Sequence, residues 1–498
     1  MNVNPITRLD YPDPDVIRVE DTYYMVSTTM HFMPGCEILQ SFDLVHWEHV
    51  TYVYETLDHT DAQQLKSGQN IYGQGMWAAS LRYHEGRFYI CFVANDTRKT
   101  YLYTSEKIDG PWKKQLIEGF YHDGSLLFDE DGRSYIVYGN DEIWITELNE
   151  DLTAPKKDGL HRLLVSDHKN PELGYEGSHI QKINGYYYIF LVHSLRDRWM
   201  RTEACFYSDS LEGEFTGGDV LCDDRGYCGQ GVAQGGIVDT PDGKWYAMLF
   251  QDSGAVGRIP ILLPVTWKDH FPVFGQNGHV PEEIEVHSTR PGYIYQPLVG
   301  SDDFCNGLLP RWQFNHDPDP RYYHLDALQG TYTITTREVC TELTQAVNTL
   351  TQRMSYPSCA AEVTVDASAL KEGDVAGLCA LQSCYAAVGI TKHHGKYEVL
   401  MLDKKEDGIL DMTEGTVVES HQMDFRLEAD FCNMKDEAHC YYRVNKGDWL
   451  PIGTVHKLYF KLDHFTGCRF GLFCYAAEET GGSACFRDFK YYDVDEIS

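Results

Sequence analysis

The stretch Gly177–Tyr188 reads GSHIQKINGYYY, and four other segments of the chain follow the same plan. Each has a short apolar run, a turn rich in Gly, Asp or Asn, and then an aromatic run, which is the pattern of a β-hairpin. The other four are Asp15–Tyr24 (DVIRVEDTYY), Ala79–Tyr89 (ASLRYHEGRFY), Gly124–Tyr135 (GSLLFDEDGRSY) and Gly235–Tyr246 (GGIVDTPDGKWY). A unit that recurs along the chain in this way indicates a repeat architecture.

A second signature follows several of the hairpins. It is a strand and turn that end in an aromatic residue, as in Ser41–Trp47, Ser105–Trp112 and Ser208–Phe215. A hairpin with two further strands makes one blade of a β-propeller. The sequence therefore predicts a five-bladed β-propeller over residues 1–290. A β-sandwich is the structural rival, but sandwiches do not repeat a four-strand unit five times.

The last third of the chain has a different pattern. From about Ser301 the repeat stops and ordinary alternating strands appear, among them Tyr332–Thr336, Ala360–Val365 and Ala386–Met401. This pattern predicts a β-sandwich over residues 301–498, after a linker at 291–300 that contains Pro291, Gly292 and Pro297. The expected fold class is all-β, which agrees with 34 Tyr, 22 Phe, 9 Trp and 43 Gly among 498 residues.

Composition limits the partners and the cellular location. The formal net charge is −33, which repels the phosphates of nucleic acids and anionic lipids, so we expect neither a nucleic acid nor a membrane as a partner. The first residues lack a basic region followed by an apolar run, and the 15 Cys include no C-x-x-C pair. These features predict a cytoplasmic protein with reduced thiols. They suit a neutral oligosaccharide as substrate and leave a homo-oligomer open.

Three carboxylates fall at equivalent places in the repeat. When the hairpins are aligned, the residue two or three places before each first strand is Asp13, Ala78, Asp123, Glu176 or Gln234. The first strand of each propeller blade lines the central channel, so these five positions converge at its mouth. We therefore expect Asp13, Asp123 and Glu176 to lie close together. For each of them taken singly, a turn-capping or surface role is the competing interpretation.

Converging carboxylates suit the hydrolysis of a glycosidic bond. One carboxylic acid protonates the leaving oxygen, a carboxylate acts on the opposite face of the sugar, and a third acid can raise the pKa of the proton donor. Phe32 and Trp77 are candidates for stacking on a sugar, and Arg258 is a candidate for bonding a sugar hydroxyl or a carboxylate; a core aromatic and a surface ion pair are the alternatives. The sequence contains no phosphate-binding Gly-Lys loop, G-x-S-x-G elbow, H-E-x-x-H motif or dinucleotide fingerprint.

Several motifs resemble glycoside hydrolase family 43, which contains β-xylosidases and α-L-arabinofuranosidases. They occur in the family's order and cover nearly the whole chain. The resemblance extends into the last third, which looks like the family's C-terminal lectin-like domain. The motifs are Asp10-Tyr11-Pro12-Asp13-Pro14-Asp15-Val16, Phe32-Met33-Pro34-Gly35, Trp77-Ala78, His122-Asp123-Gly124-Ser125, Tyr175-Glu176-Gly177, Ser301-Asp302-Asp303-Phe304 and Leu350-Thr351-Gln352-Arg353.

The resemblance implies a five-bladed propeller and an inverting mechanism. It implies that Asp13 is the general base and Glu176 the general acid, while Asp123 modulates the pKa of the acid and orients it. Arg258 matches an arginine that contacts the sugar in similar enzymes.

Two positions depart from the family's common pattern. Gln234 stands where many members have a His near a bound calcium, so we expect no required cofactor and no metal ligand, and a structural calcium is not favoured. Phe32-Met33-Pro34-Gly35 stands where xylosidases of the family often have Trp-Phe-Pro-Gly, which favours arabinofuranose over xylose.

The resulting hypothesis is an exo-acting, inverting glycoside hydrolase. It releases terminal α-L-arabinofuranose, and β-D-xylose as a second sugar, from oligosaccharides derived from hemicellulose (such as xylan) or pectin. The expected substrate-binding residues are Phe32, Trp77, Gln234 and Arg258. The alternatives are a β-D-xylosidase acting on xylo-oligosaccharides, a retaining β-fructosidase, and a propeller that binds carbohydrate without cleaving it.

Overall fold

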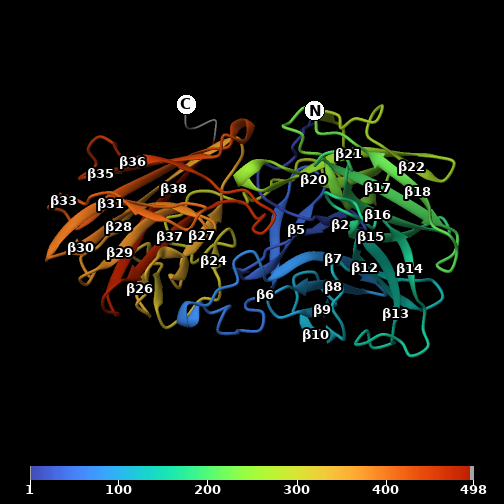
Figure 1. Ribbon diagram of the computed structural model, residues 1–498, viewed down its shortest axis with the longest axis horizontal. Coiled ribbons are helices and arrows are strands. Elements are labelled where there is room, and N and C mark those ends of the chain that lie inside the picture. The colour runs from blue at the N-terminus through green and yellow to red at the C-terminus, as the bar shows by residue number, and fades with distance from the viewer. Residues whose placement is uncertain (1, 494–498) are drawn as a thin grey trace.

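The computed structural model describes residues 2–493, which form a β-propeller and a β-sandwich side by side (Figure 1). Five four-stranded antiparallel sheets make the propeller, as the repeat predicts. Each comes from one continuous stretch of chain. In order they are β2 (Asp15–Val19), β3 (Thr22–Val26), β5 (Gly35–Ser41) and β6 (Glu48–Tyr54); β7 (Met76–His84), β8 (Arg87–Ala94), β9 (Lys99–Ser105) and β10 (Lys113–Ile117); β11 (Ser125–Phe128), β12 (Ser134–Asn140), β13 (Glu142–Leu148) and β14 (His161–Ser166); β15 (Glu176–Ile183), β16 (Tyr186–Ser194), β17 (Arg201–Ser208) and β18 (Thr216–Leu221); and β19 (Ala233–Asp239), β20 (Trp245–Asp252), β21 (Arg258–Lys268) and β22 (Phe271–Phe274).

The N-terminal segment fastens the first blade to the fifth. Strand β1 (Asn2–Val3) pairs with β23 (Glu283–Ile284). The side chain of Asn4 adds two hydrogen bonds to the backbone of Leu262 on β21, at 2.7 and 3.1 Å. Every blade consists of strands from one continuous stretch of chain, so the N- and C-terminal parts of the propeller share no blade. The β1–β23 pair and the Asn4 hydrogen bonds close the ring instead.

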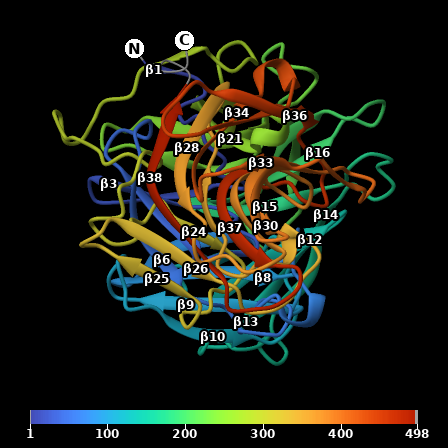
Figure 2. The same ribbon diagram turned by 90° about the vertical axis from the view of Figure 1, so that its left-hand side faces the viewer.

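Two antiparallel sheets face each other in the sandwich, with a large apolar core between them (Figure 2). The nine-stranded sheet contains β32 (Leu410–Met412), β31 (Lys396–Lys404), β30 (Tyr385–His393), β29 (Asp374–Leu381), β37 (Arg469–Ala476), β27 (Leu350–Arg353), β24 (Gln313–Asn315), β33 (Thr416–Val418) and β4 (Phe32–Met33). The seven-stranded sheet contains β25 (Tyr323–Asp326), β26 (Thr331–Thr335), β38 (Ser483–Asp493), β28 (Ser358–Asp366), β34 (Gln422–Asp430), β35 (Glu437–Arg443) and β36 (Leu450–Lys457).

Helix is confined to four short 3-10 turns within the described residues: η1 (Lys66–Gly68), η2 (Gly254–Val256), η3 (Leu343–Gln345) and η4 (Cys432–Met434). In residues 2–493 there is accordingly no helix with the length and apolar character needed to cross a bilayer. The all-β fold class predicted from the sequence is confirmed.

The backbone makes the same kink at the mouth of each blade. Asp13, Ala78, Asp123 and Gln234 all have positive φ angles, of 51°, 32°, 48° and 70°, and in the fourth blade Gly177 takes this role with φ 66°. Residues other than glycine rarely adopt this region, and such strain is retained where the surrounding structure enforces it. The kink turns the chain from the loop into the first strand, so it aims these side chains at the channel mouth.

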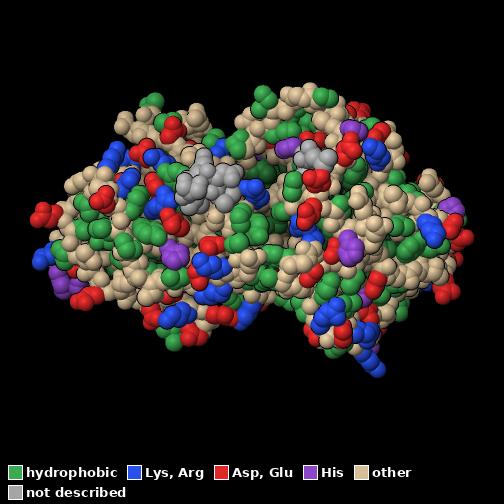
Figure 3. All heavy atoms as spheres, turned by 90° about the horizontal axis from the view of Figure 1, so that it is seen from above, with side chains coloured by type: hydrophobic (Ala, Val, Ile, Leu, Met, Phe, Trp, Pro, Cys, Tyr) green, Lys and Arg blue, Asp and Glu red, His purple; other side chains and the backbone are tan. Residues whose placement is uncertain are grey.

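The two domains are joined through the backbone as well as through side chains. Strand β4, which belongs by sequence to the first blade, pairs with β24 and so becomes the edge strand of the sandwich sheet. The backbone N–H of Cys468 donates to the carbonyl of Ala255, at 2.8 Å. Ala255, Val256 and Ile259 of the fifth blade pack in the same apolar cluster as the sandwich core. The space-filling view shows the two lobes meeting across a broad contact (Figure 3).

A buried arginine of the sandwich fixes this contact. Arg353 on β27 forms an ion pair with Glu37 on β5, at 2.8 Å, and its Nε donates to the carbonyl of Asp10, at 2.9 Å. Its guanidinium also lies 4.2 Å from the centre of the Tyr11 ring. Glu37 is buried and accepts one further hydrogen bond, from His49 at 3.0 Å.

We expect Arg353→Met to lower the free energy of unfolding by about 3–5 kcal/mol, because it leaves the Glu37 carboxylate buried without its main counter-charge. Differential scanning calorimetry measures the change. The control is Arg133→Met, which removes an arginine from an ion pair with Asp131 whose partners are both nearly half exposed. That variant should lose less than about 1 kcal/mol. Equal losses in the two variants would contradict the interpretation.

Candidate active site

Asp13, Asp123 and Glu176 meet at one end of the propeller channel. Asp13 and Asp123 end the loops that precede β2 and β11, and Glu176 is the first residue of β15. Asp13, Asp123, Gly177 and Gln234 line one narrow cavity at this end, together with the starts of the first strands. The convergence predicted from the hairpin alignment is thus present in the structure.

Asp13 belongs to a buried chain of alternating charges. Its Oδ1 accepts a hydrogen bond from Nη1 of Arg258, at 2.7 Å, and its Oδ2 accepts one from Thr28. Arg258 also bonds Asp252 through Nε, at 3.2 Å, and Asp252 in turn pairs with Arg201. Each of these four charged side chains is at most 6% exposed. Along this chain two buried arginines alternate with two buried carboxylates, and Arg258 lies between Asp13 and Asp252.

Asp123 and Glu176 lie together on the other side of the mouth, with His122 between them. Nε2 of His122 is 3.5 Å from Oδ2 of Asp123 and 3.4 Å from Oε2 of Glu176. The side-chain amide of Asn140 also donates to Oε2 of Glu176, at 3.0 Å. The backbone N–H of Gly177 donates to Oδ2 of Asp123, at 2.9 Å, which fixes that carboxylate beside the first turn of β15.

The pKa values of these three groups are shifted in different directions. Burial raises the pKa of Asp123 to about 6, because the favourable charge of His122 only partly offsets it. Burial also acts to raise the pKa of Glu176, but the hydrogen bond and charge of His122, with Arg201 and Arg258, outweigh it and leave this pKa lowered. Burial acts to lower the pKa of His122, but Asp123 and Glu176 outweigh it and raise this pKa to about 9.

A loop of the sandwich covers one side of the site. Phe465, between β36 and β37, packs edge-on against Trp77 with ring centres 5.1 Å apart. The guanidinium of Arg258 lies 3.7 Å from the centre of the Phe465 ring. Phe465 is only 4% exposed. The sandwich therefore contributes a wall to the mouth of the propeller.

The other residues expected to bind substrate lie in different environments. Trp77 is partly exposed beside His122, with ring centres 6.4 Å apart, and so lies at the site. Arg258 is there too, although Asp13 and Asp252 already engage it. Gln234 is buried in the channel wall, where its side chain lies against Gly177. Phe32 is 2% exposed with the guanidinium of Arg469 3.4 Å from its ring centre, so one face of that ring is unavailable to a sugar.

Sequence reasoning did not single out four of the residues that shape the site: His122, Asn140, Asp252 and Phe465. His122 precedes Asp123 directly and could have been found from that adjacency. Asn140 and Asp252 end the second strands of their blades, and a polar residue there carries no distinctive signal. Phe465 comes from the other domain, so only the docking of the domains reveals it.

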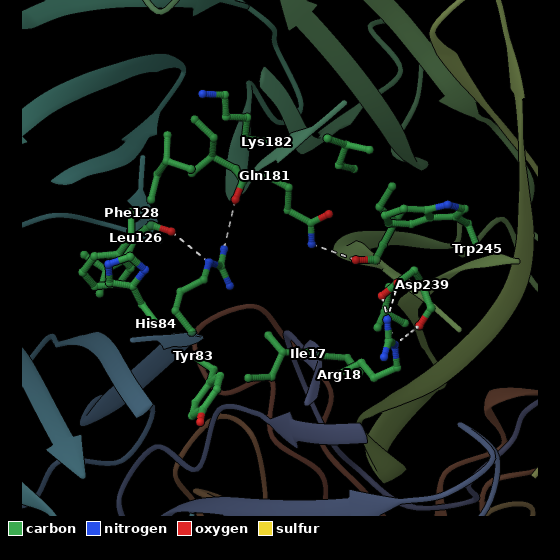
Figure 4. A pocket seen from close by; sticks show the side chains of 17 residues that line it. Ile17, Arg18, Tyr83, His84, Leu126, Phe128, Gln181, Lys182, Asp239 and Trp245 are labelled. Carbon is green, nitrogen blue, oxygen red and sulfur yellow. Dashed lines mark hydrogen bonds and ion pairs between the residues drawn. The ribbon is translucent and has the colours of Figure 1, made fainter. Parts of the chain in front are cut away.

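The opposite end of the channel has a larger hollow, of about 400 Å³, lined by side chains from all five blades (Figure 4). Its charged groups are already paired: Arg18 with Asp239, Arg82 with Asp15, and Lys182 with Asp129 and Glu130. Arg82 also bonds Ser125 and the carbonyl of Leu126, and so plugs the channel floor.

Comparisons with known proteins agree with this geometry. Residues 3–272 match the profile of glycosyl hydrolases family 43, and residues 301–492 match the β-xylosidase C-terminal concanavalin A-like domain. A β-xylosidase of Formosa agariphila is 26% identical over 99% of this chain and 89% of its own length. A non-reducing end α-L-arabinofuranosidase of Bacteroides ovatus is 24% identical over 82% of this chain and 79% of its own.

Among solved structures, a protein of Bacteroides eggerthii described as a bifunctional GH43-CE is 42% identical, with a TM-score of 0.91. The match covers 99% of this chain but only 63% of that longer protein. The family profile covers more than half of the present chain, in the domain that carries the three carboxylates. The chain therefore belongs to glycosyl hydrolases family 43 and is a glycosidase.

Proposed function

We propose that the protein is an exo-acting, inverting hydrolase that releases terminal α-L-arabinofuranose, and β-D-xylose as a second sugar, from hemicellulose- or pectin-derived oligosaccharides. One observation carries the proposal: the carboxylates at the mouth have contrasting surroundings. Asp13 is bonded to a buried arginine, whereas Asp123 and Glu176 share the vicinity of a histidine. Pairs of carboxyl groups whose environments separate their pKa values are typical of an acid and a base that work together.

The roles follow from these surroundings. Asp13, which accepts a hydrogen bond from Arg258, suits the general base that activates water. Glu176 has one carboxylate oxygen bonded by His122 and Asn140 and the other free to approach a leaving oxygen, which suits the general acid. Asp123 modulates the pKa of the general acid Glu176, through its contact with His122 and through its own charge. In an inverting enzyme the base and the acid flank the bond, with room for water beside the base.

The wall formed by Phe465 and Trp77 supports exo action on a small sugar. It narrows the mouth on the side of the sandwich, and a chain end fits a narrowed mouth better than a chain interior does. The names of the relatives support pentose as the sugar class, since one is a β-xylosidase and another releases arabinofuranose from non-reducing ends. A β-D-xylosidase as the main activity is the alternative, and the ratio of the two activities decides between them.

We also propose that hydrolysis needs no metal ion. Two of the three carboxylates at the mouth are engaged: Asp13 by Arg258 and Thr28, and Asp123 by Gly177 and His122. Calcium takes six to eight oxygen ligands, and the buried amide of Gln234 adds only one at the fifth-blade position. These residues therefore do not fit a calcium site on the propeller axis.

The assignment of acid and base is tested with 4-nitrophenyl α-L-arabinofuranoside, 4-nitrophenyl β-D-xyloside and an arabinose-substituted xylo-oligosaccharide. We expect Asp13→Asn and Glu176→Gln each to lower kcat/KM on the oligosaccharide by at least about 100-fold, the usual contribution of general acid–base catalysis. Release of 4-nitrophenol should fall less in Glu176→Gln, because that group leaves without help from an acid. The control is Glu130→Gln, an exposed carboxylate of the propeller.

Full activity of Asp13→Asn would show that the site is misassigned. A wild-type protein that binds these oligosaccharides without cleaving them would identify a carbohydrate-binding propeller instead. The anomeric form of the first sugar released, followed by ¹H NMR, tests inversion; retention of configuration would contradict the proposed mechanism.

Removal of metal ions should leave the activity unchanged. After dialysis against EDTA we expect kcat/KM on either aryl pentoside to stay within about two-fold of the untreated value, because Arg258 already bonds Asp13 and the N–H of Gly177 already bonds Asp123. A loss that calcium restores would contradict this expectation.

Phe465→Ala should impair the use of short substrates. It removes a ring that packs on Trp77 and Arg258, and burying an aromatic ring of this kind contributes about 1.5–3 kcal/mol. We expect KM for the aryl pentosides to rise roughly ten-fold, with a smaller loss on longer oligosaccharides, as measured by steady-state kinetics. Phe425→Leu, in the sandwich core and not at the site, controls for loss of stability.

A further inference from the structure

His122 occupies a place that the three-carboxylate scheme leaves unexplained. Its imidazole lies between the buried carboxylate of Asp123 and the partly exposed carboxylate of Glu176, and its Nε2 is almost equally distant from both, at 3.5 Å from Asp123 and 3.4 Å from Glu176. Its side chain is 20% exposed. A histidine with two carboxylate neighbours holds its proton strongly, because each anion favours the charged ring.

The contacts of Glu176 are asymmetric. His122 and Asn140 both approach Oε2, at 3.4 and 3.0 Å. Within residues 2–493 no donor bonds Oε1, and this oxygen is the one that remains to face a substrate. His122 and Asn140 thus engage the same oxygen of the carboxylate and leave the other one without a donor.

This arrangement creates a problem for a general acid. The positive charges around Glu176 favour its ionised form, and an ionised carboxylate has no proton to give to the leaving oxygen. The proton required for the reaction is instead present on the neighbouring imidazole. A source of protons within hydrogen-bonding reach of Glu176 is therefore part of the site already.

We propose that His122 stores the proton that Glu176 delivers to the leaving group. The inference rests on the proposed function and assigns the proton supply of that same site. When a neutral sugar displaces water from the mouth, the charged pair of imidazolium and carboxylate loses solvation. The neutral pair of imidazole and carboxylic acid is then favoured, because separated charges cost more in a medium of low dielectric constant.

The proton balance closes over one cycle. The proton leaves Nε2 of His122 and binds Oε2 of Glu176. Rotation about Cγ–Cδ, a soft two-fold torsion, exchanges the two oxygens and brings the acidic O–H towards the sugar. Glu176 gives this proton to the glycosidic oxygen as the C–O bond breaks, and Asp13 takes one from the attacking water. Solvent then returns the proton to His122 and removes the one on Asp13.

Several elements place groups around the His122 ring, and the charged ones among them influence its pKa. Asp123 follows it in the chain, Glu176 comes from β15, Asn140 from β12 and the Trp77 ring from β7. Asp13 also favours the charged ring. The pKa of His122 is raised to about 9, so the stored proton is present at neutral pH and is lost as the pH rises through about 9. The cations Arg201 and Arg258 are engaged by Asp252 and Asp13.

The test compares wild type, His122→Gln and His122→Phe. A glutamine can still donate a hydrogen bond to Oε2 of Glu176 but cannot store a proton. For wild type we expect the alkaline limb of kcat/KM on an arabinose-substituted xylo-oligosaccharide to fall near pH 9. In both variants we expect this limb to move to lower pH by at least about one unit. At pH 8 both should lose on the order of 100-fold on this substrate but less than about ten-fold on the 4-nitrophenyl pentosides.

The matched control is His456→Phe, which removes a buried histidine of the sandwich that pairs with Asp403. It should shift neither limb. An alkaline limb that stays in place in the variants, or restoration of the oligosaccharide activity by His122→Gln, would overturn the proposal and leave His122 a purely positioning role.

A second measurement separates the failure of this inference from the failure of the proposed function. Titration of the His122 ring by ¹⁵N NMR, assigned with His122→Gln, needs no substrate. A pKa near 9 supports proton storage, and a value near 6.5 overturns it. Wild-type protein that cleaves none of the pentosides would instead contradict the proposed function itself.

Discussion

The carboxylate of Asp10 joins three parts of the molecule at one point. Its Oδ1 accepts a hydrogen bond from the backbone N–H of Arg258, at 2.8 Å, and its Oδ2 accepts one from that of Gly467, at 2.7 Å. The first blade, the fifth blade and the sandwich therefore meet at a buried acid, whose pKa burial raises to about 6. Asp13 lies three residues further along the chain, and Phe465 lies two residues before Gly467. The positions of Asp13, Arg258 and Phe465 therefore depend on this junction.

The charged groups of the site follow from the same constraint. Arg258 begins β21 where Asp10 holds its backbone, and its side chain then reaches Asp13 and Asp252 between the rings of Phe250 and Phe465. A buried arginine in such surroundings is stable only with its counter-charges in place. The ring that covers it comes from the sandwich, so the electrostatics of Asp13 are tied to the docking of the two domains.

The two sides of the mouth differ for a physical reason. One fixed cation, Arg258, pairs with Asp13, and a guanidinium does not release its proton. A titratable imidazole accompanies Asp123 and Glu176, and it can release one. A propeller allows this difference because each blade places one residue at the channel mouth. Other strands then supply a different partner for each of these residues, a guanidinium in one case and an imidazole in the other.

The sequence by itself determined the repeat, and through it the fold. The alternation of apolar and polar residues and the turn residues act locally, so the five hairpins can be recognised in the sequence. Equivalent positions of the hairpins then converge when the propeller closes. That reasoning places Asp13, Asp123 and Glu176 together. It did not find that Phe465 walls the mouth, that Arg469 covers Phe32, or that one oxygen of Glu176 is engaged by His122 and Asn140. Only the tertiary structure decided these contacts, because they join residues far apart in the chain through docking and side-chain rotation, which leave no periodic signal in the sequence.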